Sequence, residues 1–81
     1  MNHACPCCRY LTLDEEPPGT FEICPVCGWE DDEVQFLDPT YDGGANAVNL
    51  DQARRNFAAF GAIDERSLGS ARKPFAEEIP D

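Results

Sequence analysis

The chain has 81 residues, of which 42% are hydrophobic, and it carries a net charge of −10. A chain of this length forms one domain with a modest core, and domains this small often need a metal ion or disulfides for stability. No segment approaches the roughly 20 apolar residues of a membrane span, and six Lys and Arg against 16 Asp and Glu are few for binding nucleic-acid phosphates.

The N-terminal segment predicts the cellular compartment. Residues 1–4 lead directly into cysteines and leave no room for the apolar stretch of a secretory signal. We therefore expect a cytoplasmic protein. Because thiols stay reduced in that compartment, paired cysteines indicate a metal site rather than disulfides.

The first third of the chain predicts a β-hairpin between two cysteine pairs. Two short β-favouring runs, 9–13 and 20–23, flank a turn over 14–19 that contains two prolines and a glycine. We expect the two runs to pair as antiparallel strands. Their far ends would then bring together the cysteine pairs, which are Cys5 with Cys8 and Cys24 with Cys27.

These four cysteines have the spacing of a metal site. Each pair has the form C-x2-C, and 15 residues separate the two pairs. A C-x2-C turn directs two sulfurs toward one point, and two such turns supply four sulfurs at roughly 2.3 Å, which suits tetrahedral Zn²⁺. We expect one structural Zn²⁺. Iron stays open as an alternative, because similar paired knuckles bind iron in rubredoxins, and two disulfides are the non-metal alternative.

Two further residues lie close to the expected ligands. Cys7 is either a small, partly buried residue or a reactive thiol that could make the chain a thiol or metal sensor. His3 is expected to be solvated, with metal ligation as the alternative. Four protein ligands leave no open coordination position, and the chain has no nucleophile–base pair, so we expect no enzyme.

The second cysteine pair is followed by Trp29 and an acidic run. Trp29 is expected either to cover the metal site or to contact a partner. The acidic run, with Trp29, is the candidate surface for binding a basic protein, and its members are Glu30, Asp31, Asp32 and Glu33. Val34, Phe36 and Leu37 are apolar and are expected to be buried beside the hairpin, before a loop over 38–44.

Residues 50–60 predict the main α-helix. Asn49 is a good N-cap and Gly61 is well placed to end the helix. The spacings of three and four residues predict one apolar face, which we expect to pack on the hairpin, made by Leu50, Ala53, Phe57 and Phe60. Residues 64–81 predict a mostly irregular tail held by Leu68 and Phe75.

The predicted fold class is therefore a small metal-stabilised α+β domain: a zinc-ribbon-like β-hairpin with two CPxC knuckles, followed by one C-terminal α-helix. The single domain covers residues 1–81. It divides into a zinc-ribbon-like part (1–37), a loop and helix (38–63) and the tail (64–81).

Five stretches of the chain carry motifs that are specific when taken together: residues 5–10, 23–32, 43–46, 50–57 and 72–74. In these stretches the chain resembles one family, the bacterial cysteine-rich proteins named after their CPCC motif. The resemblance implies a small stand-alone zinc-ribbon-like domain, and it predicts the fold better than the function.

Three functions are compatible with these features. The leading hypothesis is a zinc-stabilised module whose acidic surface binds a basic protein, for example an immunity or antitoxin-like protein that blocks a basic toxin. The alternatives are a nucleic-acid-binding zinc ribbon and a thiol or metal sensor that uses Cys7.

Overall fold

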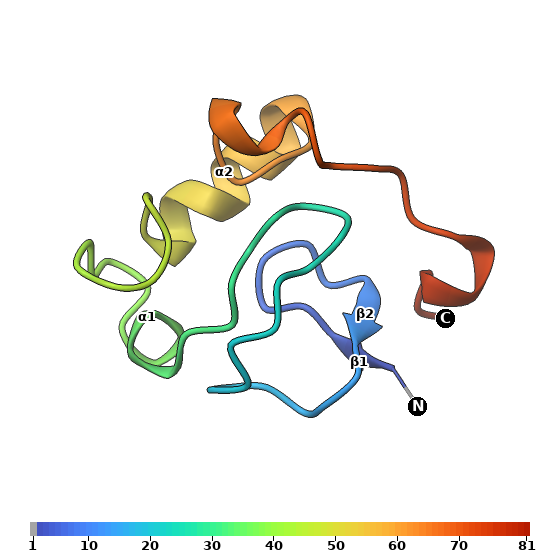
Figure 1. The fold of residues 1–81 in the computed structure, drawn as a ribbon, viewed down its shortest axis with the longest axis horizontal. Coiled ribbons are helices and arrows are strands. Elements are labelled where there is room, and N and C mark those ends of the chain that lie inside the picture. The colour runs from blue at the N-terminus through green and yellow to red at the C-terminus, as the bar shows by residue number, and fades with distance from the viewer. Residues whose placement is uncertain (1) are drawn as a thin grey trace.

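The computed structural model describes residues 2–81, which fold as a small α+β domain (Figure 1). None of the helices in this part of the chain is both long and apolar enough to cross a membrane. The elements in chain order are β1 (His3–Ala4), β2 (Leu11–Leu13), α1 (Glu33–Leu37), α2 (Leu50–Phe60) and two 3-10 turns, η1 (Glu65–Ser67) and η2 (Ala76–Glu78).

The β-hairpin is present, but its strands differ from the predicted ones. β1 pairs antiparallel with β2, with His3 opposite Leu13, so this hairpin encloses the first cysteine knuckle. The predicted pairing of 9–13 with 20–23 is wrong. Residue Ile23 instead lies opposite Glu30, on the far side of the second knuckle. Each knuckle turns the chain back on itself, so the segments on either side of it pair with each other.

The two knuckles have the same backbone geometry, displaced by 19 residues in the sequence. The N–H of Cys5 donates to the carbonyl of Tyr10, and the N–H of Cys24 donates to the carbonyl of Trp29, both at 2.9 Å. Arg9 of the first knuckle occupies the position of Gly28 in the second, and the two residues make the same contact. The N–H of Arg9 donates to the carbonyl of Cys5, and the N–H of Gly28 donates to the carbonyl of Cys24, both at 2.9 Å.

The segment after the second knuckle forms the short helix α1, which the sequence analysis did not predict. Val34 and Leu37 are 54% and 71% exposed, and Phe36 is also exposed, so the expected burial of these apolar residues is wrong. The buried residue of α1 is Gln35, whose side-chain N–H groups donate to the carbonyls of Tyr41 and Val48 at 3.1 Å. The helix turns this amide inward because it binds two carbonyl groups of the following loop.

Helix α2 begins and ends where the sequence predicted. The side chain of Asn49 accepts a hydrogen bond from the N–H of Gln52 at 2.7 Å, and Gly61 ends the helix in the left-handed conformation. Leu50 and Ala53 are fully buried.

The apolar face of α2 is narrower than predicted. Phe57 is half-buried and meets the ring of Tyr10 edge to face, with centroids 6.2 Å apart. Phe60 is exposed, so it does not belong to the buried part of this face.

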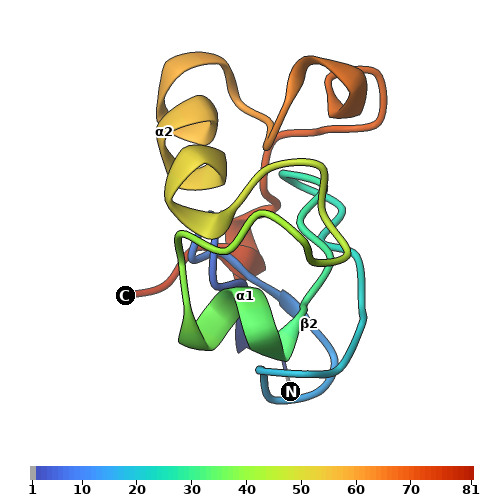
Figure 2. The same cartoon turned by 90° about the vertical axis from the view of Figure 1, so that its left-hand side faces the viewer.

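Two contacts fasten α2 and the segment after it to the knuckles. The guanidinium of Arg54 donates two hydrogen bonds to the carbonyl of Pro6 in the first knuckle, at 3.0 and 2.9 Å. The N–H of Ile63 donates to the carbonyl of Cys27 in the second knuckle at 2.9 Å. The helix and the residues after it therefore contact both knuckles, and α2 lies above β1 and β2 in Figure 1 and above α1 in Figure 2.

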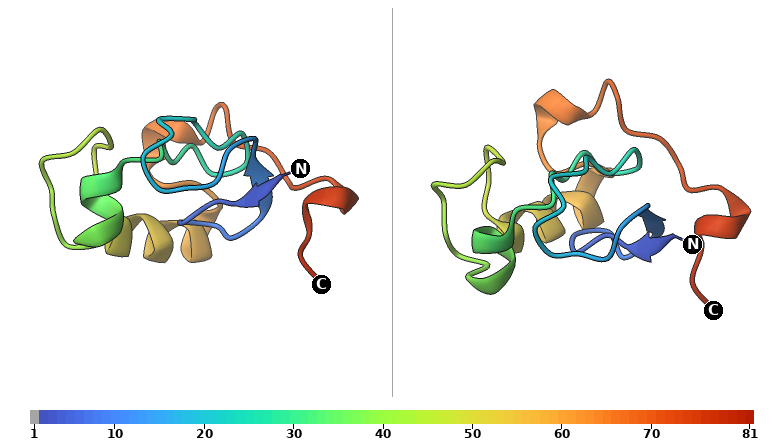
Figure 3. Two further views of the ribbon diagram at one scale, coloured as in Figure 1. Left: turned by 90° about the horizontal axis from the view of Figure 1, so that it is seen from below. Right: turned by 60° about the horizontal axis from the view of Figure 1, so that its bottom comes forward.

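The tail contains η1 and η2, and η2 packs near β2 (Figure 3). Its expected apolar anchors, Leu68 and Phe75, are both exposed, so that expectation is wrong. A polar contact joins the tail to the second knuckle instead, since the N–H of Arg72 donates to the carbonyl of Val26 at 3.3 Å. Within the tail, the guanidinium of Arg72 binds the carboxylate of the buried Glu78 through two hydrogen bonds of 2.8 and 2.9 Å. The ring of Phe75 lies 3.9 Å from the Arg72 guanidinium.

Candidate metal centre

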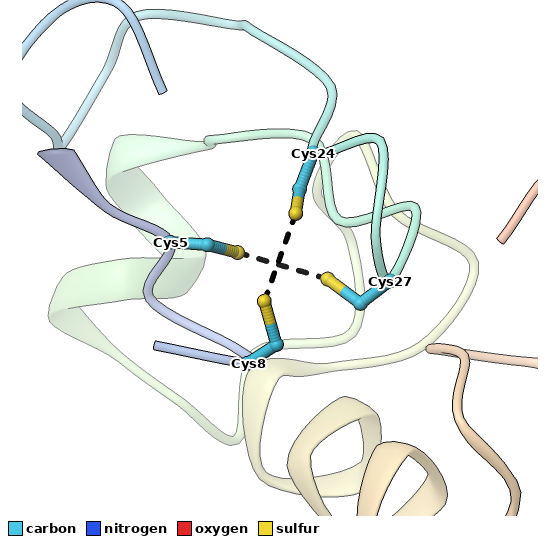
Figure 4. A group of neighbouring side chains, drawn as sticks. All are labelled: Cys5, Cys8, Cys24 and Cys27. Atoms are coloured by element: carbon cyan, nitrogen blue, oxygen red, sulfur yellow. Dashed lines mark hydrogen bonds between the residues drawn. The ribbon is translucent and has the colours of Figure 1, made fainter. Parts of the chain in front are cut away.

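The four cysteines of the two C-x2-C pairs meet at one point (Figure 4). Their sulfur atoms all lie within 4.8 Å of one another. Cys5 and Cys27 face each other with sulfurs 3.7 Å apart, and so do Cys8 and Cys24. Each knuckle thus contributes two sulfurs to a single cluster that is almost fully enclosed, since only Cys8 keeps partial exposure.

The spacing of the sulfurs fits a tetrahedral metal ion. Four sulfurs at roughly 2.3 Å from a central ion are about 3.8 Å apart at the tetrahedral angle. The observed 3.7 Å agrees with that figure. The donor set of four thiols suits a thiophilic ion such as zinc or iron and does not suit magnesium or calcium. The cluster is therefore a four-cysteine site placed to hold one metal ion.

Hydrogen-bond donors around the cluster stabilise negative charge on the sulfurs. The backbone N–H of Cys7 donates to the sulfur of Cys5, and that of Trp29 donates to the sulfur of Cys27, both at 3.4 Å. The hydroxyl of Thr12 lies 3.0 Å from the sulfur of Cys24 and can donate to it. The sequence interpretation missed Thr12, because nothing in a lone threonine on a short strand indicates contact with a ligand 12 residues away.

Contacts within the cluster shift the pKa values of three of its thiols. Hydrogen bonds from Cys27, then from Cys5 and Cys8, lower the pKa of Cys24. The same contacts to Cys24 raise the pKa of Cys8 and of Cys27. Four sulfurs this close cannot all carry negative charge unaided, whereas a bound dication favours the thiolate form of every ligand.

Cys7 and His3 are not part of the four-sulfur cluster. Cys7 is 5% exposed and packs in the hydrophobic core beside the ligands, which agrees with its interpretation as a small buried residue. His3 lies in β1, opposite Leu13, and is not a member of the cluster.

The expected partner-binding run lies only partly on the surface. Trp29 and Asp31 are fully buried and Asp32 is 8% exposed, which corrects their interpretation as surface contacts. Glu33 is exposed and Glu30 is half-buried.

The two buried carboxylates bind backbone groups. Asp31 accepts hydrogen bonds from the N–H and hydroxyl of Thr20 at 2.9 and 2.8 Å. Asp32 is the N-cap of α1 and also accepts from the N–H of Ala45 at 2.8 Å, and these bonds, the one from Ala45 foremost, lower its pKa. Both side chains therefore hold the chain around the second knuckle rather than face a partner.

An amide network beside the second knuckle was also missed. The side chain of Asn46 binds both the N–H and the carbonyl of Glu30 at 2.8 Å, as a neighbouring strand would. Its amide also donates to the side-chain oxygen of Gln35 at 2.9 Å. The sequence does not indicate these contacts, because the partners of Asn46 are 11 and 16 residues away.

Comparison with known proteins supports this picture of the site. No curated protein sequence matches the chain. A protein-family model described as "Cysteine-rich CPCC" matches residues 3–78, a span that includes both knuckles, α1, α2 and the tail. The chain therefore belongs to the cysteine-rich CPCC family.

Proposed function

We propose that the chain is a non-catalytic, zinc-stabilised protein-interaction module of the cytoplasm. The observation that carries the proposal is the closed shell of four sulfurs, which come from both knuckles and lie within 4.8 Å of one another. Four protein ligands fill a tetrahedral coordination sphere, so a bound ion has a structural role and no position for substrate. All five cysteines are free thiols, the state that a reducing compartment maintains.

Elemental analysis and an absorption spectrum test the zinc assignment. We expect one zinc ion per chain in elemental analysis of protein purified without added metal. Zinc tetrathiolate is colourless and iron tetrathiolate absorbs visible light, so an absorption spectrum separates the two metals. A coloured protein with one iron per chain would assign the site to iron in place of zinc. A metal-free protein with oxidised thiols would refute the proposal.

Serine substitutions test the ligand assignment and the coupling of metal binding to folding. Cys24→Ser and Cys8→Ser are expected to lose the metal and most of the folded structure, because the unfolded chain has no preformed site. Cys7→Ser is the matched control and is expected to keep both, since its sulfur is not among the four. If Cys7→Ser loses the metal while Cys8→Ser keeps it, the ligand assignment is wrong.

The partner that we propose is a basic protein, with an immunity or antitoxin-like role as one specific form. Because Asp31 and Asp32 are buried, we assign the contact to a different set of residues, here called the α1 surface. It combines the exposed carboxylate of Glu33 with the exposed apolar side chains of Val34 and Leu37. The acidic turn 14–16 is exposed, and the same turn brings Gly19 beside the side chain of Glu33.

This surface has the composition of an interface for a positively charged partner. The carboxylate of Glu33 and those of the acidic turn 14–16 raise the association rate with a basic protein, and the apolar side chains of the α1 surface supply affinity. Of the six Lys and Arg, the guanidinium groups of Arg54, Arg55 and Arg72 form hydrogen bonds within the chain, which leaves three. This number of free cations is small for a protein that binds nucleic-acid phosphates, which disfavours the nucleic-acid alternative. The burial of Cys7 disfavours the sensor alternative, because a sensing thiol has to be accessible.

Charge reversal tests the α1 surface. A variant with Glu15, Glu16 and Glu33 changed to Lys is expected to lose partners that the wild-type protein captures from its native host. The matched control reverses three exposed carboxylates elsewhere, at Glu65, Glu77 and Asp81, and is expected to keep them. Equal losses in both variants, or captured partners that are acidic or nucleic acid, would contradict the assignment.

A further inference from the structure

A cleft of about 500 Å³ lies between the C-terminal end of α2, the tail and the two knuckles. Tyr10 of the first knuckle and Val26 of the second belong to its lining, together with Phe57 and Phe60 of α2 and Leu68 of the tail. The volume is within the range of sites that take one bulky side chain or a small ligand. Apolar groups from four separate segments of the chain thus converge on one hollow.

The apolar residues of the cleft differ in exposure, which gives it a floor and a rim. Val26 is fully buried, and Tyr10 and Phe57 are half-buried. Phe60 and Leu68 are 40% and 46% exposed. An apolar side chain placed in the cleft would contact the buried and half-buried residues of the floor and cover the exposed rim residues Phe60 and Leu68. This contact removes apolar surface of both molecules from water.

The charge of the cleft is opposite to that of the protein as a whole. The net charge of the chain is −10, yet within residues 2–81 no Asp or Glu lines this cleft, and two cations, Arg72 and Lys73, do. Lys73 is exposed and forms no ion pair with any other described residue. Its charge is therefore available to a carboxylate from outside.

Contacts within the chain already show which groups Arg72 binds. Its guanidinium holds the carboxylate of Glu78 through two hydrogen bonds, and it lies 3.9 Å from the ring of Phe75. One short segment, Phe75 to Glu78, thus supplies both the aromatic ring and the carboxylate that bind the guanidinium of Arg72. Lys73, the next residue, lines the cleft without such a pair.

We propose that this cleft binds an acidic peptide segment, with one bulky apolar side chain in the hollow and a flanking carboxylate on Lys73. The partner is a protein of opposite charge to the one assigned to the α1 surface, so the two sites are independent. The floor of the cleft is formed by residues of both knuckles, which the metal ion would hold together. Binding therefore requires the metal-loaded protein.

Fluorescence polarisation with short labelled peptides tests the proposal on the full-length, zinc-loaded protein. The probe is an acetylated, amidated pentapeptide with a central Phe between pairs of Asp. We expect saturable binding that is roughly thirtyfold weaker when the central Phe becomes Ala, because the ring loses its contact with the cleft. We also expect weaker binding when the four Asp become Lys, and no binding after the metal is removed with a chelator.

Two matched variants separate a local contact from general charge. Lys73→Glu is expected to weaken binding roughly fivefold and to reduce its dependence on salt. Arg55→Glu makes the same charge change on an exposed part of α2 outside the cleft and is expected to leave binding unchanged. Elemental analysis of both variants checks that the metal site is intact.

Three results would overturn the proposal. They are the absence of saturable binding, equal effects of Lys73→Glu and Arg55→Glu, and equal affinity of the Phe-centred and Ala-centred peptides. A further arm uses 3-phenylpropionate, which has the ring and a carboxylate without a peptide backbone. Binding of that compound without binding of the peptide would make the cleft a small-molecule site and would refute the peptide assignment.

Discussion

The residue after each cysteine pair provides a test of how strongly backbone conformation limits the stability of this fold. Arg9 and Gly28 occupy equivalent positions in the two knuckles, and both have left-handed backbone angles, with φ of 70° and 89°. Glycine adopts this conformation freely, whereas a residue with a Cβ is strained by about 1 to 2 kcal/mol. The second knuckle has the residue that this turn favours, and the first does not.

Two opposite substitutions should therefore change stability in opposite directions. Gly28→Ala introduces the backbone strain and also places a Cβ 2.9 Å from the Cβ of Ser67. We expect a loss of about 2 to 4 kcal/mol, since crowding of this kind adds about 1 to 3 kcal/mol. Arg9→Gly relieves the strain but loses about 0.4 to 1 kcal/mol through the greater freedom of the unfolded chain, so we expect a net gain of about 0.5 to 1 kcal/mol.

Urea unfolding at one fixed concentration of free zinc measures both effects, because metal bound to the folded state contributes to its stability. The control is Gly69→Ala, where an added Cβ meets no atom within 4 Å, and we expect a change below about 1 kcal/mol. Adding Ser67→Gly to Gly28→Ala removes the crowding and leaves the backbone strain, so the double variant should recover part of the loss. The reasoning is refuted if Gly28→Ala costs no more than Gly69→Ala, or if Arg9→Gly destabilises the protein.

Two further predictions concern the contacts that hold the helices. Arg54→Gln removes the charged hydrogen bonds to the carbonyl of Pro6 and is expected to lower the unfolding free energy by about 1.5 to 3 kcal/mol, whereas Arg55→Gln, on the exposed side of α2, should change it by less than about 0.5 kcal/mol. Asp32→Asn keeps an acceptor for the N-cap of α1 but turns an NH2 donor toward the N–H of Ala45, and it is expected to cost about 1 kcal/mol at neutral pH. Because hydrogen bonds lower the pKa of Asp32, the advantage of the wild-type protein is complete above about pH 4 and is lost as the pH falls through the lowered folded-state value. Urea unfolding of both proteins at equal free zinc measures this difference, and a difference that persists unchanged at the lowest pH would contradict the role of the carboxylate.

The features that the sequence predicted correctly are those determined by neighbouring residues. A C-x2-C turn positions its two sulfurs within four residues, so spacing alone was enough to identify the cluster that the structure brings together. The limits of α2 followed from Asn49 and Gly61, which act on the adjacent turn of helix.

The errors concern contacts between distant residues. A strand of two or three residues has too little periodicity to specify its partner, so the pairing of β2 with β1 could not be distinguished from pairing with residues 20–23. The acidic run was interpreted as surface from its charge, but Asp31 and Asp32 are buried and accept hydrogen bonds from backbone donors 11 and 13 residues away. The inward position of Gln35 depends in the same way on the carbonyls of Tyr41 and Val48.

The repeated geometry of the two knuckles has a consequence for how the metal ion is acquired and released. Each pair of ligands lies in a loop that is closed by a backbone hydrogen bond between residues five apart in the sequence. Loops of this size close within about 100 ns. Each knuckle can therefore form a two-sulfur half-site before the rest of the domain is ordered. An ion captured by one half-site meets the other at the high effective concentration set by a 15-residue tether. We expect release to follow the reverse order, so that an ion given up by one knuckle would still be held by the two sulfurs of the other.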